Sequence, residues 1–412
     1  IVEMDISLFN SDRVCRGEIQ ISGSKSEYNR LLILKAFIND LKIENISNSD
    51  DSVLLDKALK SNESIINIGH AGTAMRFLTA YYATQVGKEI ILTGSKRMQE
   101  RPVGILVDAL KKIGADINYT GKIGFPPLKI RGKNLISNNI SLPANVSSQF
   151  ITAILLIAPF LKNGIKLKLV DKITSLPYLK MTISLLKKIG VKVKFEKNTI
   201  DIKELKTNKK IKNIIVESDW SSASYLYSCV ALSIDAELKI KSFSNKSLQG
   251  DSIVSKIYEK LGVITIYDSK QIVLIKKKNF NLPNSLECNL IDSPDIAQTI
   301  AVTCFGLGVK CDLYGLHTLK IKETDRLNAL KLELQKLGSN VTITDDSIHI
   351  SKGKIDFSNI KIKTYNDHRM AMAFAPLGLL KPITIESSNV VSKSFPDFWD
   401  NIIQMGFQIN KV

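Results

Sequence analysis

Cationic and hydroxyl side chains recur at points where the chain turns strongly apolar. The segment GSKSEYNR supplies Lys25, Ser26 and Arg30 within roughly one and a half helical turns. Two cations and a hydroxyl can together neutralise and hydrogen-bond a phosphate or a carboxylate. This first cluster therefore predicts an anion-binding helix start.

Further clusters have the same character. They are GHAGTAMR with Gly72 and Arg76, RMQERPVG with Arg97 and Arg101, VSSQF with Ser147, Ser148 and Gln149, YNDHRMAMAF with Asp367, His368 and Arg369, and VVSKSFPDF with Lys393. A cation at a helix start opposes the helix dipole, so Arg101 suggests a bound anion. Simple capping remains the alternative for the hydroxyl residues, and a solvated surface for the isolated cations.

Carboxylates are few among these cations, and two of them stand out. Glu323 lies in KIKETDR beside Lys322 and Arg326, and Asp295 opens the apolar segment SPDIAQTIA. Many cations around two carboxylates suit acid/base chemistry on acidic substrates. Taken alone, KIKETDR is also typical of a solvated face with local ion pairs, and Asp295 of a helix N-cap.

These clusters are spaced by an internal repeat. One set of helices, the A helices, is expected to begin near Lys25, Gly72, Ser148, Ser221, Asp295 and His368. A second set, the B helices, is expected to begin near Asp51, Arg101, Pro177, Asp251, Thr324 and Pro396, in each case 26 to 30 residues after its A helix. Short β-branched runs lie between them, so the chain predicts six units of two helices and several strands, the first one shortened.

The repeat explains how distant clusters could meet. The A helices, such as FITAILLIAPF, are apolar nearly all round and should be buried, whereas the B helices carry lysines on one side. Glycines such as Gly114 and Gly190 follow the B helices, where a left-handed residue ends a helix. If several A helices point the same way, their electropositive N-termini converge on one site. Six units can form a solenoid or two groups of three.

Composition excludes several classes of protein. The chain has 412 residues and a net charge of +17, with a globular share of hydrophobic residues and no stretch long enough to span a bilayer. Five scattered cysteines and four histidines form no disulfide or zinc pattern. Gly17 to Gly23 lacks Walker A spacing, and no dinucleotide fingerprint follows a strand. We expect a reduced, cytoplasmic protein with no metal and no cofactor.

Taken together, these motifs resemble the 5-enolpyruvylshikimate-3-phosphate synthase family, in the family's order along the whole chain. The segments that carry the resemblance are GSKSEYNR, GHAGTAMR, LTGSKRMQERPVG, VSSQF, ESDWSSASY, KIKETDR, YNDHRMAM and SKSFPD. The resemblance implies an α/β fold: a two-domain inside-out α/β barrel of six βαβαββ repeats, three per domain. The top domain would span 22–217, the bottom domain 1–21 plus 218–412, and the active site would lie in the cleft between them.

The resemblance also implies a reaction. The family transfers the enolpyruvyl group of phosphoenolpyruvate to the 5-hydroxyl of shikimate 3-phosphate and releases phosphate, in the shikimate pathway to chorismate and aromatic amino acids. It would need no cofactor, nucleic acid or membrane, and we expect a monomer. Both substrates are anions, which accounts for the many cations.

The resemblance assigns roles residue by residue. Shikimate 3-phosphate would be held by Lys25, Ser26, Arg30, Ser147, Ser148, Gln149, Ser175, Tyr178, Asp295 and Lys322. Phosphoenolpyruvate would be held by Lys25, Gly72, Arg101, Gln149, Arg326, Arg369 and Lys393. The catalytic residues would be Asp295, which takes the hydroxyl proton, Glu323, which delivers a proton to the methylene carbon, and Lys25.

The sequence departs from the family pattern at three positions. His70 stands where the family usually has Asn, Thr318 where some members have Asn, and Phe77 where Pro is common. Gly72 is retained, so glyphosate should compete with phosphoenolpyruvate.

Three other functions stay open. The first is UDP-N-acetylglucosamine enolpyruvyl transfer, although no cysteine follows Arg101 in a glycine-rich loop. The second is a nucleic-acid-binding module that uses the +17 charge. The third is a catalytically silent relative that still binds shikimate 3-phosphate.

Overall fold

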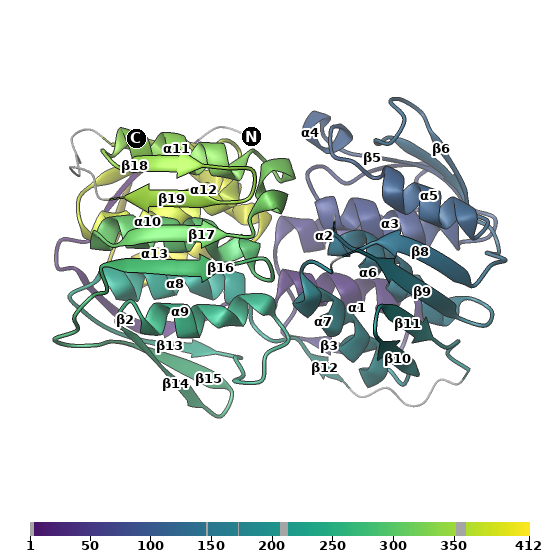
Figure 1. The fold of residues 1–412 in the computed structure, drawn as a ribbon, viewed down its shortest axis with the longest axis horizontal. Coiled ribbons are helices and arrows are strands. Elements are labelled where there is room, and N and C mark those ends of the chain that lie inside the picture. Colours follow the sequence, from purple (N-terminus) through teal and green to yellow (C-terminus); the bar gives the residue numbers. More distant parts are fainter. Residues whose placement is uncertain (1–3, 146, 172, 207–212, 352–359) are drawn as a thin grey trace. The chain divides into compact units, whose positions relative to one another are not determined.

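The chain divides into two compact units. The computed structural model describes residues 4–145, 147–171, 173–206, 213–351 and 360–412. The N-terminal unit is Gly23–Val216, and the C-terminal unit combines Ile1–Ser22 with Glu217–Val412. Each unit contains three A helices, three B helices and three sheets within the described ranges (Figure 1).

The A helices form the core of each unit. They are α1 (Lys25–Phe37), α3 (Gly72–Ala83) and α6 (Ser148–Ile157) in the N-terminal unit, and α8 (Trp220–Leu232), α10 (Ala297–Leu307) and α12 (His368–Phe374) in the C-terminal unit. Every residue of α12 and every residue of α6 from Phe150 on is buried. The predicted burial of these apolar helices is therefore confirmed.

The B helices are amphipathic and end as the glycines predict. They are α2 (Asp50–Lys60), α5 (Gly104–Lys112), α7 (Leu176–Lys188), α9 (Val254–Glu259) with the preceding 3-10 turn η2 (Gly250–Ile253), α11 (Arg326–Lys336) and α13 (Phe398–Gln404). Gly114 and Gly190 have φ values of +104° and +92°, in the left-handed region where a side chain is strained. These glycines stop each helix and direct the chain back into a strand.

Two four-stranded sheets and one short sheet cover the N-terminal unit. Their strand orders are β4 (Ile65–Asn67), β5 (Glu89–Thr93), β7 (Leu128–Arg131), β6 (Asp116–Tyr119); β8 (Asn139–Pro143), β9 (Ile165–Val170), β11 (Thr199–Ile202), β10 (Val193–Glu196); and β3 (Ile43–Glu44) with β12 (Ile214–Ile215). In the described residues the first repeat has only this two-stranded sheet, as its predicted shortening requires.

Three four-stranded sheets cover the C-terminal unit, and the N-terminal segment completes two of them. Their orders are β2 (Val14–Ile19), β13 (Asp235–Lys241), β15 (Gln271–Lys276), β14 (Val263–Asp268); β16 (Ser285–Asn289), β17 (Lys310–Tyr314), β19 (Ile348–Ser351), β18 (Asn340–Ile343); and β20 (Lys361–Ile362), β21 (Ile383–Ile385), β1 (Ile6–Phe9), β22 (Gln408–Lys411). Strands β1 and β2 therefore tie the start of the chain to the last and the fourth repeat.

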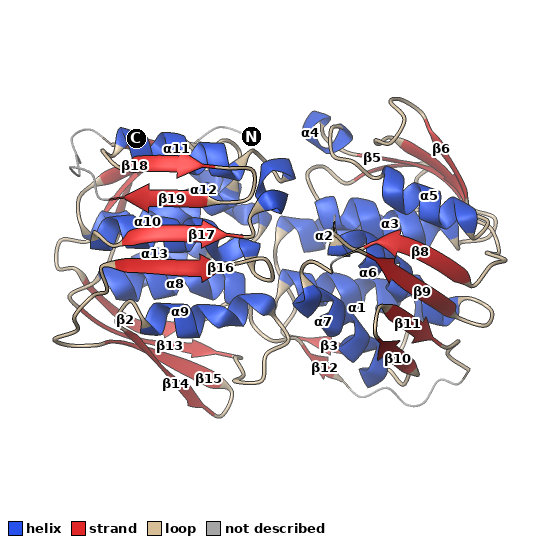
Figure 2. Cartoon of the chain, viewed as in Figure 1, coloured by secondary structure: helices blue, strands red, loops and turns tan. Residues whose placement is uncertain are grey.

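Every four-stranded sheet has the same register logic. Its first two strands are parallel, and the next two pairs are antiparallel, as in β16–β17–β19–β18. An A helix joins the parallel pair in each of these sheets except that of β2 and β13, which the N-terminal unit separates along the chain. In β9, inward Ile165, Leu167 and Leu169 alternate with outward side chains. Figure 2 shows the sheets outside the helices in each unit. The predicted α/β fold of βαβαββ repeats, with helices inside, is confirmed.

A short helix, α4 (Lys96–Gln99), follows Gly94, and the Ser95 hydroxyl caps it by accepting from Met98 N–H. No helix in the described ranges is both long and apolar enough to cross a membrane.

Close approach of two strands makes one glycine essential. Gly164 has φ +69°, and a Cβ there would lie 2.0 Å from the carbonyl oxygen of Ile202. Gly87 has φ +84° but nothing within 4 Å. We expect Gly87→Ala to lower the free energy of unfolding by about 1–2 kcal/mol through backbone strain alone. Gly164→Ala should lower it by a further ~1–3 kcal/mol, because steric strain is added to the same backbone strain. Urea unfolding of both variants measures the difference; equal midpoints would contradict it.

Candidate active site

A buried arginine, Arg326, lies at the start of α11 in the C-terminal unit. Its side chain is 2% exposed, and it donates through Nε to Asp367 Oδ2 at 2.6 Å, through Nη1 to Asp295 Oδ1 at 3.1 Å and through Nη2 to Glu323 Oε2 at 2.7 Å. Burial alone would lower the pKa of Arg326, but the charges of Asp367, Glu323 and Asp295 outweigh it and raise the pKa. Arg326 therefore stays charged and fixes three carboxylates.

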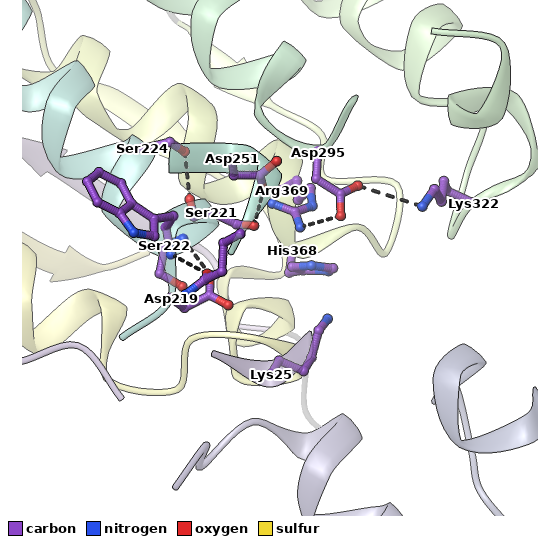
Figure 3. Close-up of polar contacts among 12 residues, drawn as sticks. Lys25, Asp219, Ser221, Ser222, Ser224, Asp251, Asp295, Lys322, His368 and Arg369 are labelled. Carbon is purple, nitrogen blue, oxygen red and sulfur yellow. Dashed lines mark hydrogen bonds and ion pairs between the residues drawn. The ribbon is translucent and has the colours of Figure 1, made fainter. Parts of the chain in front are cut away.

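A second buried guanidinium lies on the other side of Asp295. Arg369, in the first turn of α12, contacts Asp295 Oδ2 through Nη2 at 3.0 Å and donates through Nη1 to the hydroxyl of Tyr225 at 3.2 Å. Asp367 caps α12 by accepting from the Arg369 backbone N–H at 2.9 Å. Figure 3 shows Asp295 between Arg369 and Lys322. Asp295 is in the 3-10 turn η3 (Pro294–Ile296). The N-cap residue is Ser293 for this turn and Ile296 for α10, so the N-cap interpretation of Asp295 was wrong.

Two lysines complete this group of charges. Lys322 Nζ lies 3.7 Å from Asp295 Oδ1, and Lys393 Nζ lies 2.8 Å from Glu323 Oε1. Lys322 follows the 3-10 turn η4 (His317–Ile321), and Lys393 ends another, η6 (Ser388–Lys393). Asp295 therefore has two arginines and one lysine as partners, and Glu323 has one arginine and one lysine. The solvated-face interpretation of KIKETDR was wrong for Arg326.

In the N-terminal unit, Lys25 and Arg30 extend from α1. Lys25 Nζ lies 3.2 Å from Asp51 Oδ2 at the start of α2. Arg30 is buried and donates to Thr182 Oγ1 at 2.8 Å and to the Ser26 carbonyl at 2.5 Å, with longer bonds to Thr152 and to the Tyr178 carbonyl. These acceptors are neutral oxygens, and burial lowers the pKa of Arg30 to about 10. A buried cation held by neutral groups favours a nearby anion.

Gly72 and Arg101 meet at the start of α3. A Cβ at Gly72 would lie 2.6 Å from Arg101 Nη1, so the guanidinium covers the helix terminus because the residue is glycine. Arg76, expected on the helix surface, is instead buried and donates to the carbonyls of Gly72 and Pro102 at 2.9 and 3.1 Å. Arg76 thereby fastens the segment that carries Arg101 to α3.

The start of α6 lies beside that of α3. Gln149 Nε2 donates to Thr73 Oγ1 at 3.2 Å, and the Ser147 hydroxyl accepts from the Gln149 N–H as the N-cap. Ser148 is the first residue of the helix and is half-buried, as are Ser147 and Gln149. Neutral donors thus line this helix terminus.

Ser175 and Tyr178 surround the start of α7. Ser175 precedes the helix with φ +54°, an uncommon left-handed conformation for a residue with a side chain. Tyr178 places its ring 5.8 Å from the Arg30 guanidinium. Both residues are half-buried.

The three unusual positions have distinct surroundings. His70 Nδ1 lies 2.9 Å from the Ser95 hydroxyl, so His70 is held against the start of α4. Phe77 is buried under Arg30, with 5.8 Å from the guanidinium carbon to the ring. The buried Thr318 hydroxyl has no hydrogen-bond partner among the described residues.

One geometric rule connects these contacts. In four repeats the start of the A helix touches the start of the B helix. The contacts are Lys25 with Asp51, Gly72 with Arg101, Ser221 with Asp251, and Asp295 with Arg326. Of the predicted site residues, ten lie in the N-terminal unit and six in the C-terminal unit; they are Lys25, Ser26, Arg30, Gly72, Arg101, Ser147, Ser148, Gln149, Ser175 and Tyr178, and Asp295, Lys322, Glu323, Arg326, Arg369 and Lys393.

Sequence reasoning missed three side chains of these groups. Asp51 and Asp251 were recognised only as helix starts, and Tyr225 only as part of an apolar helix. The signal for the two aspartates was available, because both occupy the same point of their repeats, the first turn after the A-to-B connection. Tyr225 carried no such signal. No group of three or more potential metal ligands occurs in the described part of the chain.

Comparison with solved structures identifies the class of fold. The chain is similar to EPSP synthase from Acinetobacter baumannii, with a TM-score of 0.78, 22% identity, and 99% of this chain and 100% of that chain covered. It is also similar to the enolpyruvyl transferase NikO from Streptomyces tendae, with a TM-score of 0.75, 12% identity, and 100% and 99% covered. The fold is that of the enolpyruvyl transferases.

Sequence comparison then identifies the family. A family model described as EPSP synthase (3-phosphoshikimate 1-carboxyvinyltransferase) matches residues 36–402. A 3-phosphoshikimate 1-carboxyvinyltransferase from Bacteroides fragilis is 43% identical over 406 residues, 98% of each chain. One from Colwellia psychrerythraea is 35% identical over 422 residues, 94% of this chain and 96% of that one. The chain belongs to the EPSP synthase family, as the motifs predict.

The buried position of Asp367 gives a stability test. Asp367→Asn removes the charge that faces Arg326 and leaves a buried guanidinium with weaker partners, so we expect a loss of about 3–5 kcal/mol. Asp345→Asn is the matched control, because Asp345 pairs with Lys320 at 2.6 Å on the exposed surface. Chemical denaturation should shift for the first variant and stay unchanged for the second. A similarly small shift of the denaturation midpoint in both variants would show that Asp367 is not needed to stabilise the buried charge of Arg326.

Proposed function

We propose that this protein transfers the enolpyruvyl group of phosphoenolpyruvate to the 5-hydroxyl of shikimate 3-phosphate and releases phosphate. The proposal places it in the shikimate pathway to chorismate and aromatic amino acids. Membership in the EPSP synthase family and the names of relatives up to 43% identical support it. The observation that carries it is the position of Asp295 and Glu323, which both contact Arg326 and each have a lysine as a further partner.

That arrangement suits the chemistry of the reaction. Protonation of the methylene carbon makes the adjacent enol carbon electrophilic, while a base removes the proton of the attacking hydroxyl; a tetrahedral adduct forms and then loses phosphate. We assign Asp295 as the base and Glu323 as the acid. Arg326 touches both carboxylates and holds their separation, and the surrounding cations neutralise the substrate anions when water is excluded.

Binding roles follow from the local chemistry of each group. We propose that Arg101, Arg326, Arg369 and Lys393 bind phosphoenolpyruvate with Gly72 and Gln149, because they are charged or open donors at helix starts. Shikimate 3-phosphate would be bound by Ser26, Arg30, Ser147, Ser148, Gln149, Ser175, Tyr178, Asp295 and Lys322. Lys25 would contact both substrates and assist catalysis. The domain limits 22–217 and 1–21 plus 218–412, and a site between them, stay predictions.

Two rival functions make different predictions. UDP-N-acetylglucosamine enolpyruvyl transfer would use a different acceptor, and the relatives named above carry the shikimate name. Nucleic-acid binding through the +17 charge would give salt-sensitive retention on heparin without turnover. We propose a cytoplasmic monomer that needs no cofactor and no nucleic acid.

Phosphate release tests the proposed function directly. We expect release from phosphoenolpyruvate only when shikimate 3-phosphate is present, and a loss of about 10²–10⁴-fold in Asp295→Ala and Glu323→Ala. Asp235→Asn is the control, because Asp235 pairs with Arg16 away from these residues. Release without shikimate 3-phosphate, or full activity of both alanine variants, would reject the assignment.

Glyphosate competition tests the role of Gly72. We expect glyphosate to raise the apparent KM for phosphoenolpyruvate, because an anionic competitor can bind to Arg101 at the start of α3. Gly72→Ala would place a Cβ 2.6 Å from Arg101 Nη1 and displace the guanidinium. In that variant the KM for phosphoenolpyruvate should rise by about tenfold, equivalent to about 1.4 kcal/mol, and glyphosate competition should weaken. If glyphosate inhibits the parent protein and Gly72→Ala equally, the start of α3 is not where glyphosate binds.

A further inference from the structure

Asp251 is a buried carboxyl group to which the proposed mechanism gives no role. It lies in η2 with 2% of its surface exposed, and its Oδ2 accepts a hydrogen bond from the hydroxyl of Ser221 on α8. Its Oδ1 is buried and has no hydrogen-bond partner among the described residues. A buried carboxylate oxygen without a donor is costly, so this atom needs either a proton or a partner.

The complementary atom is on Arg369. Arg369 contacts Asp295 and Tyr225 through its two terminal nitrogens, but its Nε–H is buried and has no acceptor in the described part of the chain. Asp251 and Asp295 both act on Arg369 electrostatically. Figure 3 shows Asp251, Asp295 and Arg369 gathered at the start of α12. The acceptor Asp251 Oδ1 and the donor Arg369 Nε, both without a partner among the described residues, therefore belong to one cluster of charges with Asp295.

The groups that face Asp251 come from several elements. Asp295 on η3 and Asp219 at the start of α8 are anionic, Arg369 on α12 is cationic, and Ser221 on α8 donates a hydrogen bond. Burial and the charge of Asp295 raise the pKa of Asp251 to about 7, against the opposing effects of Arg369 and Ser221. Asp251 is thus neutral below neutral pH and anionic above it.

We propose that Asp251 is a positioning residue of the phosphoenolpyruvate site, where it shares one negative charge with Asp295 across the guanidinium of Arg369. The proposal rests on the proposed function. With Asp251 neutral, Arg369 has one carboxylate partner and keeps positive charge for an anionic substrate. With Asp251 ionised, a second carboxylate competes for the guanidinium, and Arg369 binds the substrate anion less well.

The direction of the pH effect follows. The KM for phosphoenolpyruvate should rise several-fold between about pH 6 and about pH 9, as Asp251 loses its proton. The effect should be larger on KM than on kcat, because Asp251 acts on a binding cation. The phosphate group of the substrate also titrates near pH 6, but this contribution is common to all variants and cancels in their ratio.

Three variants make the test. Asp251→Asn keeps the shape and removes the charge, so its KM should lack the rise seen in the parent protein. Ser221→Ala removes a hydrogen bond that favours the anion, so the rise should move to higher pH. Asp219→Asn removes an anion that disfavours ionisation and retains a capping side chain for α8, so the rise should move to lower pH.

The outcomes separate the inference from the proposed function. A parent protein that releases no phosphate rejects the proposed function. A parent with normal release whose KM follows the same pH curve in Asp251→Asn rejects the inference. If circular dichroism shows that Asp251→Asn does not fold, the other two variants decide: opposite shifts support the role of Asp251, and unshifted or equally shifted curves overturn it.

Discussion

The burial of Arg326 is the constraint on which the C-terminal unit depends. A guanidinium that is 2% exposed cannot remain charged without compensation, so Asp295, Glu323 and Asp367 must all reach it. These carboxylates come from η3, from the loop before α11 and from the loop before α12, so the ion group fixes three chain segments at once. The same contacts hold Asp295 and Glu323, the proposed base and acid, to one guanidinium.

The repeat explains why such a group can form from distant residues. Each A helix is buried, and in four repeats its start contacts the start of the B helix that follows. Helix starts carry unpaired N–H groups, which allows cations and neutral donors to be used for anions instead of for stabilising the helices. The outer sheets and the glycines after the B helices fix the positions of the helices in each repeat. The side chains at the helix starts can therefore differ from one repeat to the next.

The periodic features of the sequence predicted most of the fold. The predicted A-helix starts at Lys25, Gly72 and Ser148 are the first helical residues of α1, α3 and α6. These starts could be predicted because apolar periodicity and N-caps act locally. The partners of the charges were harder to predict. Asp51, Asp251 and Tyr225 contact their cations or hydroxyls only after the helices pack, and a single aspartate at a helix start is identical in sequence to an ordinary cap. Strands β1 and β2 also complete sheets that are far away in sequence.

The two units provide electrostatically different halves of the proposed chemistry. In the C-terminal unit the cations are already paired with carboxylates, so a substrate anion must compete with Asp295 or Glu323 for them. In the N-terminal unit Arg30 is held by neutral oxygens, and a phosphate would add the counter-charge that burial withholds. Proton transfer is best served where carboxylates have strong cationic partners, and phosphate binding where a buried cation has none. Under the proposed roles, the ion group around Arg326 would serve acid/base work, and Arg30 would bind the phosphate of shikimate 3-phosphate.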